Sequence, residues 1–245
     1  MGGAIVEVAV QTIVWGEART NDLARVLREA AQAGYAGVEL RPPENQEAAA
    51  EMIKANGLRL AASHTNINNV ERDVENQLRW LALNDAHILA CSGSDFATSS
   101  QIREKAANLD RAGQICRQHG VTLCYHNHAH EIHHDLFVLG HLLRATDPAN
   151  VKLCPDTYWL ERGGQDAPSL LRLLGDRVAY VHLKDMAADG SFAEVGQGRL
   201  DWAAIREVLL ELHLPWCAVE QDNTKRTPLE SSQLSRTYIR EHWGL

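Results

Sequence analysis

The chain has 245 residues, of which 45% are hydrophobic and 23% charged, an ordinary balance for a globular protein. Its formal net charge is −8 and its longest basic grouping is Lys225-Arg226, which argues against a nucleic-acid-binding role because such proteins gather Lys and Arg on one surface. No apolar run approaches the length of a membrane span, and the first residues lack the basic and apolar regions of a secretion signal. Five cysteines without a CxxC spacing favour a reducing compartment. We therefore expect a cytoplasmic protein without nucleic-acid or membrane partners.

Apolar runs rich in β-branched residues alternate with segments of helical periodicity along the whole chain. Strands are predicted at residues 5–10, 37–40, 58–63, 86–91, 121–124, 151–154, 178–183 and 215–220. Helices are predicted at residues 23–33, 44–56, 70–84, 100–118, 136–145, 168–174, 201–212 and 228–243. Strict alternation implies a parallel sheet, and eight units in a chain of this length predict a single-domain α/β (β/α)₈ TIM barrel over residues 1–245. The rival, a doubly wound open sheet, lacks its GxGxxG turn after the first strand.

Ionisable side chains stand where the predicted strands end, which is where barrel enzymes place catalytic groups. The set comprises Glu39, His64, His126, His128, His130, Glu131, Asp156, His182 and Glu220. Any one of them is more often a core histidine or a helix cap. Their joint occurrence favours a site, and an oxygen and nitrogen ligand set suits one divalent ion such as Mn²⁺, Mg²⁺, Co²⁺ or Zn²⁺.

A glycine loop and three aromatic residues are further candidates. Gly196 and Gly198 would let the backbone pass close to a ligand and bring Gln197 near it, although Asp201 at the end of this loop also reads as a helix cap. Trp15, Tyr158 and Trp159 come just after strand ends. These aromatic side chains could either pack in the barrel wall or form a platform for a sugar ring.

Six ordered motifs carry a family resemblance. They are Ala33–Leu40, Tyr125-His126-Asn127-His128 with Glu131, Asp156-Thr157-Tyr158-Trp159, Val181-His182-Leu183-Lys184-Asp185, Gly196-Gln197-Gly198 with Asp201-Trp202, and Val219-Glu220-Gln221-Asp222. This ordered set resembles the xylose isomerase-like TIM-barrel superfamily. Its nearest branch is the sugar phosphate isomerase/epimerase group, which includes ketose 3-epimerases and inosose dehydratases.

The resemblance implies a metal held by Glu, Asp, His and Glu from strands five to eight. On this chain the expected ligands are Glu131, Asp156, His182 and Glu220, with His126 as the substitute for Glu131. His126 stands where many relatives carry the strand-five Glu. The DNA-repair endonuclease branch of the superfamily uses further histidines as metal ligands. This chain has Trp159 and Phe192 roughly where those histidines would be expected, so we give the endonuclease interpretation little weight.

The implied activity is a divalent-metal-dependent isomerase or epimerase. It would transfer a proton next to the carbonyl of a ketose or keto-polyol, which we expect to be unphosphorylated because no cluster of Arg is evident. Glu131 or Glu220 would remove the proton and the other carboxylate would return it. His128 and Lys184 are the expected proton carriers or hydroxyl binders. The expected substrate-binding residues are His64, Trp15, Trp159 and Gln197.

Two alternatives stay open. One is a metal-dependent dehydratase or lyase acting on an inosose or a 3-keto-glycoside, since an imidazolium can protonate a leaving oxygen. The other is a non-catalytic sugar-binding or partner subunit of the same fold. The sequence leaves the oligomeric state open, a homo-oligomer included.

Overall fold

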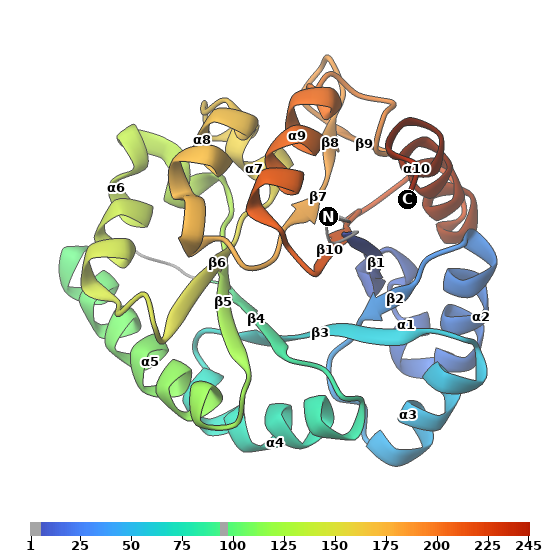
Figure 1. Ribbon diagram of the computed structural model, residues 1–245, viewed down its shortest axis with the longest axis horizontal. Helices are drawn as coiled ribbons and strands as arrows, with labels where there is room; N and C mark the ends of the chain where they lie inside the picture. Colours follow the sequence, from blue (N-terminus) through green and yellow to red (C-terminus); the bar gives the residue numbers. More distant parts are fainter. Residues whose placement is uncertain (1–5, 94–97) are drawn as a thin grey trace.

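The computed structural model describes residues 6–93 and 98–245, and these form a barrel of eight parallel strands inside a ring of helices (Figure 1). The predicted fold class is confirmed. The barrel strands are β1 (Glu7–Gln11), β2 (Gly37–Glu39), β3 (Arg59–Asn66), β4 (Ile88–Ser92), β5 (Thr122–His126), β6 (Val151–Cys154), β7 (His182–Leu183) and β10 (Trp216–Val219).

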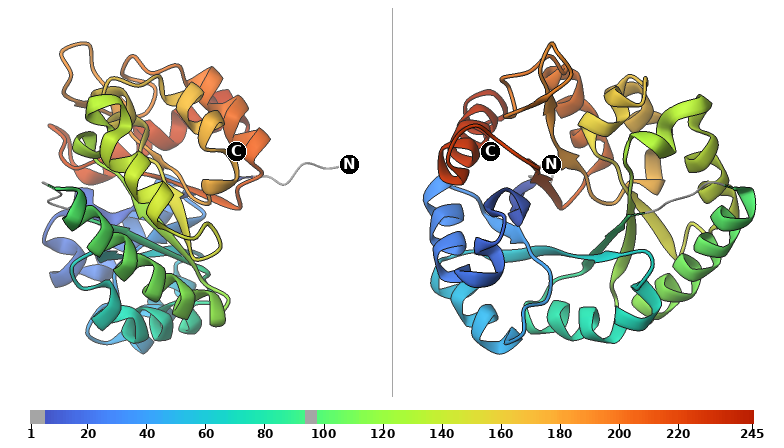
Figure 2. Two further views of the ribbon diagram at one scale, coloured as in Figure 1. Left: turned by 90° about the vertical axis from the view of Figure 1, so that its left-hand side faces the viewer. Right: turned by 180° about the vertical axis from the view of Figure 1, so that it is seen from behind.

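The helices cover the outside of the barrel, as the views from the side and from behind also show (Figure 2). They are α1 (Ala18–Asn21), α2 (Leu23–Ala33), α3 (Gln46–Ala55), α4 (Val70–Leu83), α5 (Ser99–Gln118), α6 (Ala129–Ala145), α7 (Thr157–Arg162), α8 (Ala167–Leu174), α9 (Trp202–Leu212) and α10 (Pro228–Trp243), with short 3₁₀ turns η1 (Thr12–Trp15) and η2 (Gly175–Arg177). Local signals set many ends: the Asp22 side chain caps α2 by accepting from the Arg25 N–H, and Gly34 ends it at a φ of 91°. Across the residues described, no helix combines the length and apolar character needed to span a membrane.

The barrel closes at a weak seam between β6 and β7. The strand order is β6-β5-β4-β3-β2-β1-β10-β7, and the two edge strands meet only through the isolated parallel pairs Leu153–Val178 and Asp156–His182. The strand predicted at residues 178–183 is therefore regular only at His182–Leu183. The seam nevertheless sets Asp156 directly beside His182 at the mouth of the barrel.

Alanine and cysteine side chains, together with Ile88 and Tyr180, fill the inside of the barrel. One buried cluster consists of Ala9, Ala61, Ala62, Ile88, Cys124, Cys154, Tyr180 and Ala218. The larger apolar cluster lies between the strands and the helices. All five cysteines fall within the described residues, and all are buried and free.

Several local features were not foreseen from periodicity, among them the short helix α1 and the turns η1 and η2. Helix α6 begins at Ala129 rather than at residue 136, and its run is interrupted by non-helical backbone from His133 to Leu136, with positive φ at His134, Asp135 and Leu136. A short helix, α7, follows β6 at once. A two-stranded hairpin, β8 (Asp185–Met186) with β9 (Phe192–Ala193), follows β7. Segments this short do not complete a periodic pattern.

Candidate metal centre

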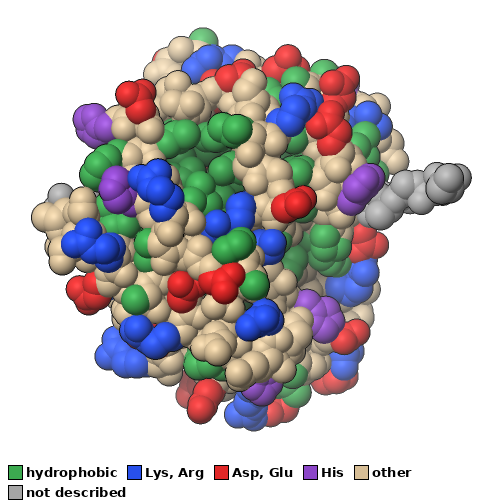
Figure 3. Space-filling view, turned by 60° about the vertical axis from the view of Figure 1, so that its left-hand side comes forward, with side chains coloured by type: hydrophobic (Ala, Val, Ile, Leu, Met, Phe, Trp, Pro, Cys, Tyr) green, Lys and Arg blue, Asp and Glu red, His purple; other side chains and the backbone are tan. Residues whose placement is uncertain are grey.

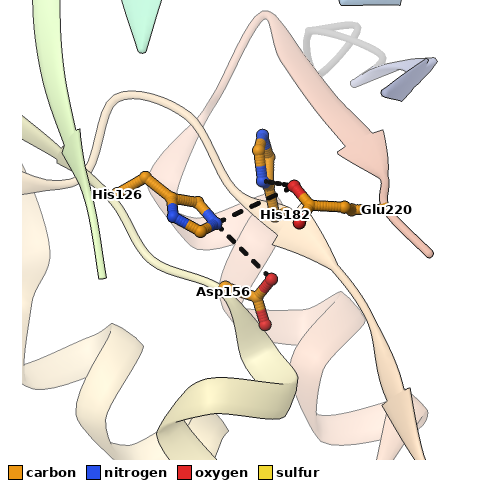
Figure 4. A group of neighbouring side chains, drawn as sticks. All are labelled: His126, Asp156, His182 and Glu220. Atoms are coloured by element: carbon orange, nitrogen blue, oxygen red, sulfur yellow. Dashed lines mark ion pairs between the residues drawn. The ribbon is translucent and has the colours of Figure 1, made fainter. Parts of the chain in front are cut away.

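Four side chains from consecutive strand ends converge at the mouth of the barrel. They belong to His126 at the end of β5, Asp156 after β6, His182 in β7 and Glu220 after β10. One nitrogen or oxygen atom of each lies within 4.8 Å of the corresponding atoms of the others. Figure 4 shows the two imidazoles and two carboxylates directed toward one another. The four residues are only 0% to 5% exposed, so water cannot solvate these groups freely.

The strand register explains why these four meet. His126 pairs with Cys154, and Asp156, two residues further along, pairs with His182. His182 pairs with Ala218, and Glu220 again lies two residues further along. Because residues two apart in a strand face the same side, all four side chains point into the barrel near its carboxyl-terminal end.

The four facing atoms fit a divalent cation. His126 Nε2 lies 3.6 Å from Asp156 Oδ2 and 3.8 Å from Glu220 Oε2, and His182 Nδ1 contacts Glu220 Oε2. Within residues 6–93 and 98–245 none of these atoms has a hydrogen-bond partner of acceptable geometry, although all are buried. Buried lone pairs that face one another are costly unless a cation lies between them. Two imidazole nitrogens with two carboxylate oxygens form a donor set typical of Zn²⁺, Mn²⁺ or Co²⁺.

Glu39 at the end of β2 fixes the orientation of His182. Its carboxylate lies 2.8 Å from His182 Nε2 and 2.7 Å from His64 Nδ1. Burial alone would raise the pKa of Glu39, but the charges and hydrogen bonds of His182 and His64 lower it to about 2. A carboxylate only accepts, so both imidazoles donate to it, and His182 is left with Nδ1 facing the centre. This carboxylate–histidine arrangement is the usual support of a metal-binding imidazole.

Lys184 places a positive charge beside the two carboxylates. Its Nζ lies 2.8 Å from Glu220 Oε1, 2.8 Å from Asp222 Oδ2 and 3.2 Å from Asp156 Oδ2. Burial by itself would lower the pKa of Lys184, but these three carboxylates raise it. Lys184 therefore stays charged, holds its proton firmly and neutralises part of the buried negative charge.

Glu131 lies outside the group of four facing side chains. It is fully buried in the first turn of α6, where it accepts hydrogen bonds from the Tyr125 hydroxyl (2.5 Å) and the His128 N–H (2.8 Å). It also lies 3.2 Å from His130 Nε2. In this arrangement the strand-five member of the group is His126.

Three other predicted residues border the group, while Trp15 and Gln197 have other neighbours. The His64 and His128 rings lie 5.8 and 5.1 Å from the His126 ring, and Trp159 lies 5.5 Å from His128. Burial lowers the pKa of His128 to about 4, and the neighbouring His126 adds to the fall. Trp15 instead donates to Glu29 on α2 at 2.6 Å.

Gln197 lies in a surface hollow beside α10. Its loop is held by Asp185, a buried residue that sequence reasoning had not singled out. The Asp185 carboxylate accepts from the N–H groups of Gly196 (2.9 Å), Gly198 (2.9 Å) and Leu200 (3.3 Å), and from the Trp202 indole (2.7 Å). A Cβ at position 198 would meet Asp185 Oδ1 at 2.2 Å, so glycine is required there. The sequence signals for Asp185 were its place beside Lys184 at a strand end and its membership of the motif Val181-His182-Leu183-Lys184-Asp185.

Two cavities flank the centre. One of about 560 Å³ is lined by Asn66, Asn68, Gly93, His128, Ala129, His130, His133 and Trp159. The other, of about 360 Å³, reaches Glu39 and His64 on the opposite side. A third cavity of about 400 Å³ lies at the amino-terminal end of the barrel, beside Arg59 and Trp216, and is lined by none of the four converging residues. On the face shown in Figure 3, acidic and basic side chains are interspersed among the residues described, and no broad basic patch is visible.

Comparison of the sequence and structure with those of known proteins identifies the family of this chain. The model of the xylose isomerase-like TIM barrel matches residues 27–242. An inosose dehydratase from Geobacillus kaustophilus (strain HTA426) is 31% identical over 58% of this chain, which spans 53% of that relative. A sugar phosphate isomerase/epimerase structure from Parabacteroides distasonis superposes with a TM-score of 0.84 at 19% identity, covering 99% of this chain and 96% of that one. The IOLI protein with a bound zinc atom superposes with a TM-score of 0.75 at 16% identity, covering 96% and 97% of the two chains. The chain belongs to the xylose isomerase-like TIM-barrel family.

Proposed function

We propose that the protein is a divalent-metal-dependent enzyme that removes the proton next to the carbonyl of a keto-polyol and then expels water, as a dehydratase. The observation that carries this proposal is the convergence of four buried, mutually facing donor atoms from His126, Asp156, His182 and Glu220. Relatives that act as inosose dehydratases support the choice of reaction.

A divalent ion held by these four residues would polarise the carbonyl and an adjacent hydroxyl oxygen and so acidify the C–H bond between them. Glu39 keeps the His182 imidazole turned toward the centre. Lys184 holds the second oxygen of Glu220 and so fixes that carboxylate. The substrate would occupy the cavity beside His128 and Trp159.

His128 is the proposed proton carrier because it borders both this cavity and the ring of His126. Its imidazole would take the proton from the carbon next to the carbonyl as that C–H bond breaks, and would return it to the hydroxyl on the following carbon as that C–O bond breaks. A carbon–carbon double bond conjugated with the carbonyl forms, and water leaves. The step needs no oxidant or reductant.

Dehydration is preferred to epimerisation because of the place of Glu131. Epimerisation requires a second proton carrier on the opposite face of the substrate. Glu131, the carboxylate expected for that role, is engaged with Tyr125 and the His128 backbone in the first turn of α6. Epimerisation remains the second candidate reaction. Analysis of the reaction products distinguishes it from dehydration.

The test is product analysis on protein that has been stripped of metal and reloaded with Mn²⁺, Co²⁺, Zn²⁺ or Mg²⁺. Inososes, 3-keto-glycosides and ketoses are incubated in D₂O. We expect metal-dependent formation of the unsaturated ketone. Solvent deuterium in a recovered epimer without any dehydrated product would instead identify an epimerase.

A non-catalytic sugar-binding role is tested with the His182→Ala variant. If wild type has no metal-dependent turnover and the variant matches it in metal binding and in stabilisation by sugars, the enzyme proposal fails.

A further inference from the structure

Two arginines, one on the short helix α1 and one just after β2, line the cavity of about 360 Å³ that lies beside the metal centre. Arg19 is half-buried on α1, and Arg41 is exposed just after β2. The same wall contains the hydroxyl-bearing residues Thr12 and Thr20. In sequence the two arginines are far apart and form no basic cluster.

Neither arginine has a counter-charge in the part of the chain that the structure describes: no ion pair and no side-chain hydrogen bond involves Arg19 or Arg41. Glu44 lines the same cavity without pairing with either, and Glu39 is already engaged by two histidines. Burial, with the charge of Arg41 adding to it, lowers the pKa of Arg19. Two like charges gathered in a hollow of a protein whose net charge is −8 favour the entry of an anion.

The inner wall of this cavity connects the arginines with the metal centre. Glu39 and His64 form that wall, and Glu39 also bonds His182. The His64 ring lies 5.8 Å from the His126 ring and 6.2 Å from the His182 ring. Glu39 and His64 therefore belong both to the lining of the arginine-bearing cavity and to the immediate surroundings of the four converging residues.

The backbone around Arg41 is stiff, which suits a binding site. Pro42 and Pro43 follow Arg41, and a residue before proline is restricted to extended conformations. A guanidinium binds carboxylate or phosphate oxygens through parallel N–H donors. Because the backbone at Arg41 is already restricted, little further ordering of that backbone is required when an anion binds.

We propose that Arg19 and Arg41 bind an anionic group of the substrate, a carboxylate or a phosphate, while the keto-polyol end of the same molecule reaches the metal centre. This inference rests on the proposed function and narrows its substrate class to a keto sugar acid or a keto sugar phosphate. A sugar acid agrees with the expectation of an unphosphorylated substrate, whereas a sugar phosphate departs from it; that expectation rested on the lack of an arginine cluster in the sequence.

The test measures binding of three probes to the metal-loaded protein by titration calorimetry: D-fructose, D-fructose 6-phosphate and 5-keto-D-gluconate. The Arg19→Gln/Arg41→Gln double variant removes both charges. Arg28→Gln is the matched control, because Arg28 is exposed on α2 and lies outside the cavity. Wild type should bind one of the anionic probes at least about tenfold more tightly than fructose. The double variant should lose that preference, and Arg28→Gln should keep it.

The preferred anion identifies the substrate as a sugar phosphate or a sugar acid. A wild type without preference, or a double variant that keeps the preference, would overturn the proposed subsite. Turnover is scored separately. If turnover depends on metal but the double variant still prefers the anionic probe, the subsite proposal fails and the proposed enzyme function is retained. Loss of the preference in the double variant without turnover of any keto-polyol leaves the subsite standing and overturns the function.

Discussion

Replacing Glu39 with Gln removes the charge that orients two buried imidazoles while leaving the side-chain shape almost unchanged. Glu39 accepts from His182 Nε2 at 2.8 Å and from His64 Nδ1 at 2.7 Å. A Gln amide can accept from one of these donors, but its NH₂ group then faces the other. The variant therefore loses at least one charge-assisted hydrogen bond and loosens the ring of His182.

The loss of unfolding free energy in metal-free Glu39→Gln can be sized from the hydrogen bonds and from the pKa of Glu39. A hydrogen bond to a charged group contributes about 1.5–3 kcal/mol. The fall in the pKa of Glu39 from 4.5 to about 2, to which the same hydrogen bonds contribute, corresponds to about 3 kcal/mol. We expect the free energy of unfolding of Glu39→Gln to be lower by about 3 kcal/mol at pH 7. Because the folded pKa lies below the unfolded one, this difference should be complete above about pH 4.5 and shrink as the pH falls toward 2.

Metal affinity should fall as well, by about 10- to 100-fold, as is usual when the support of a metal-binding imidazole is removed. Urea unfolding measures the first quantity and calorimetric titration with Zn²⁺ or Mn²⁺ the second. Glu51→Gln is the control, because Glu51 is exposed and pairs with Lys54 on the surface of α3. Stability and metal affinity equal to those of this control would refute the role assigned to Glu39.

Three further variants test the remaining parts of the site. His126→Ala should weaken metal binding far more than Glu131→Gln does in calorimetric titration, and equal losses would return Glu131 to the ligand set. Lys184→Met should lower the unfolding free energy of the metal-free protein by about 3 kcal/mol or more, because it leaves buried carboxylates without a counter-charge. Bound metal should restore part of that loss in urea titrations, and a variant as stable as wild type would contradict this role for Lys184. Asp185→Asn should speed amide hydrogen exchange in residues 196–202, whose loop the carboxylate holds, and unchanged protection there would contradict that account.

Much of the fold could be predicted because its signals are local. The strands are short β-branched runs, and many helices carry their own caps, such as Asp22 with Gly34 on α2 and the Thr227–Glu230 capping box on α10. The seam between β6 and β7 could not be predicted in the same way. Only two isolated residue pairs close it, and that depends on how the whole barrel is staggered.

The candidate site was predictable where a residue and its strand end coincide, as for Asp156, His182 and Glu220. The strand-five position was harder, because three histidines and a carboxylate follow one another there. Glu131 forms a capping box at the start of α6 in which the N-cap residue is His128. The Ser or Thr that usually marks a capping box in a sequence is therefore absent.

The shared cavity of Arg19 and Arg41 gave no sequence signal, because Arg19 lies on α1 and Arg41 follows β2. Only the folded barrel brings these two segments to one cavity.

The central claim is that His126, Asp156, His182 and Glu220 hold one divalent ion. Anomalous diffraction from crystals grown with Zn²⁺ or Mn²⁺ tests it most directly. The account predicts a single strong peak per chain, within bonding distance of His126 Nε2, Asp156 Oδ2, His182 Nδ1 and Glu220 Oε2. A peak bound by Glu131 in place of His126, or no peak among these atoms at saturating metal, would contradict it.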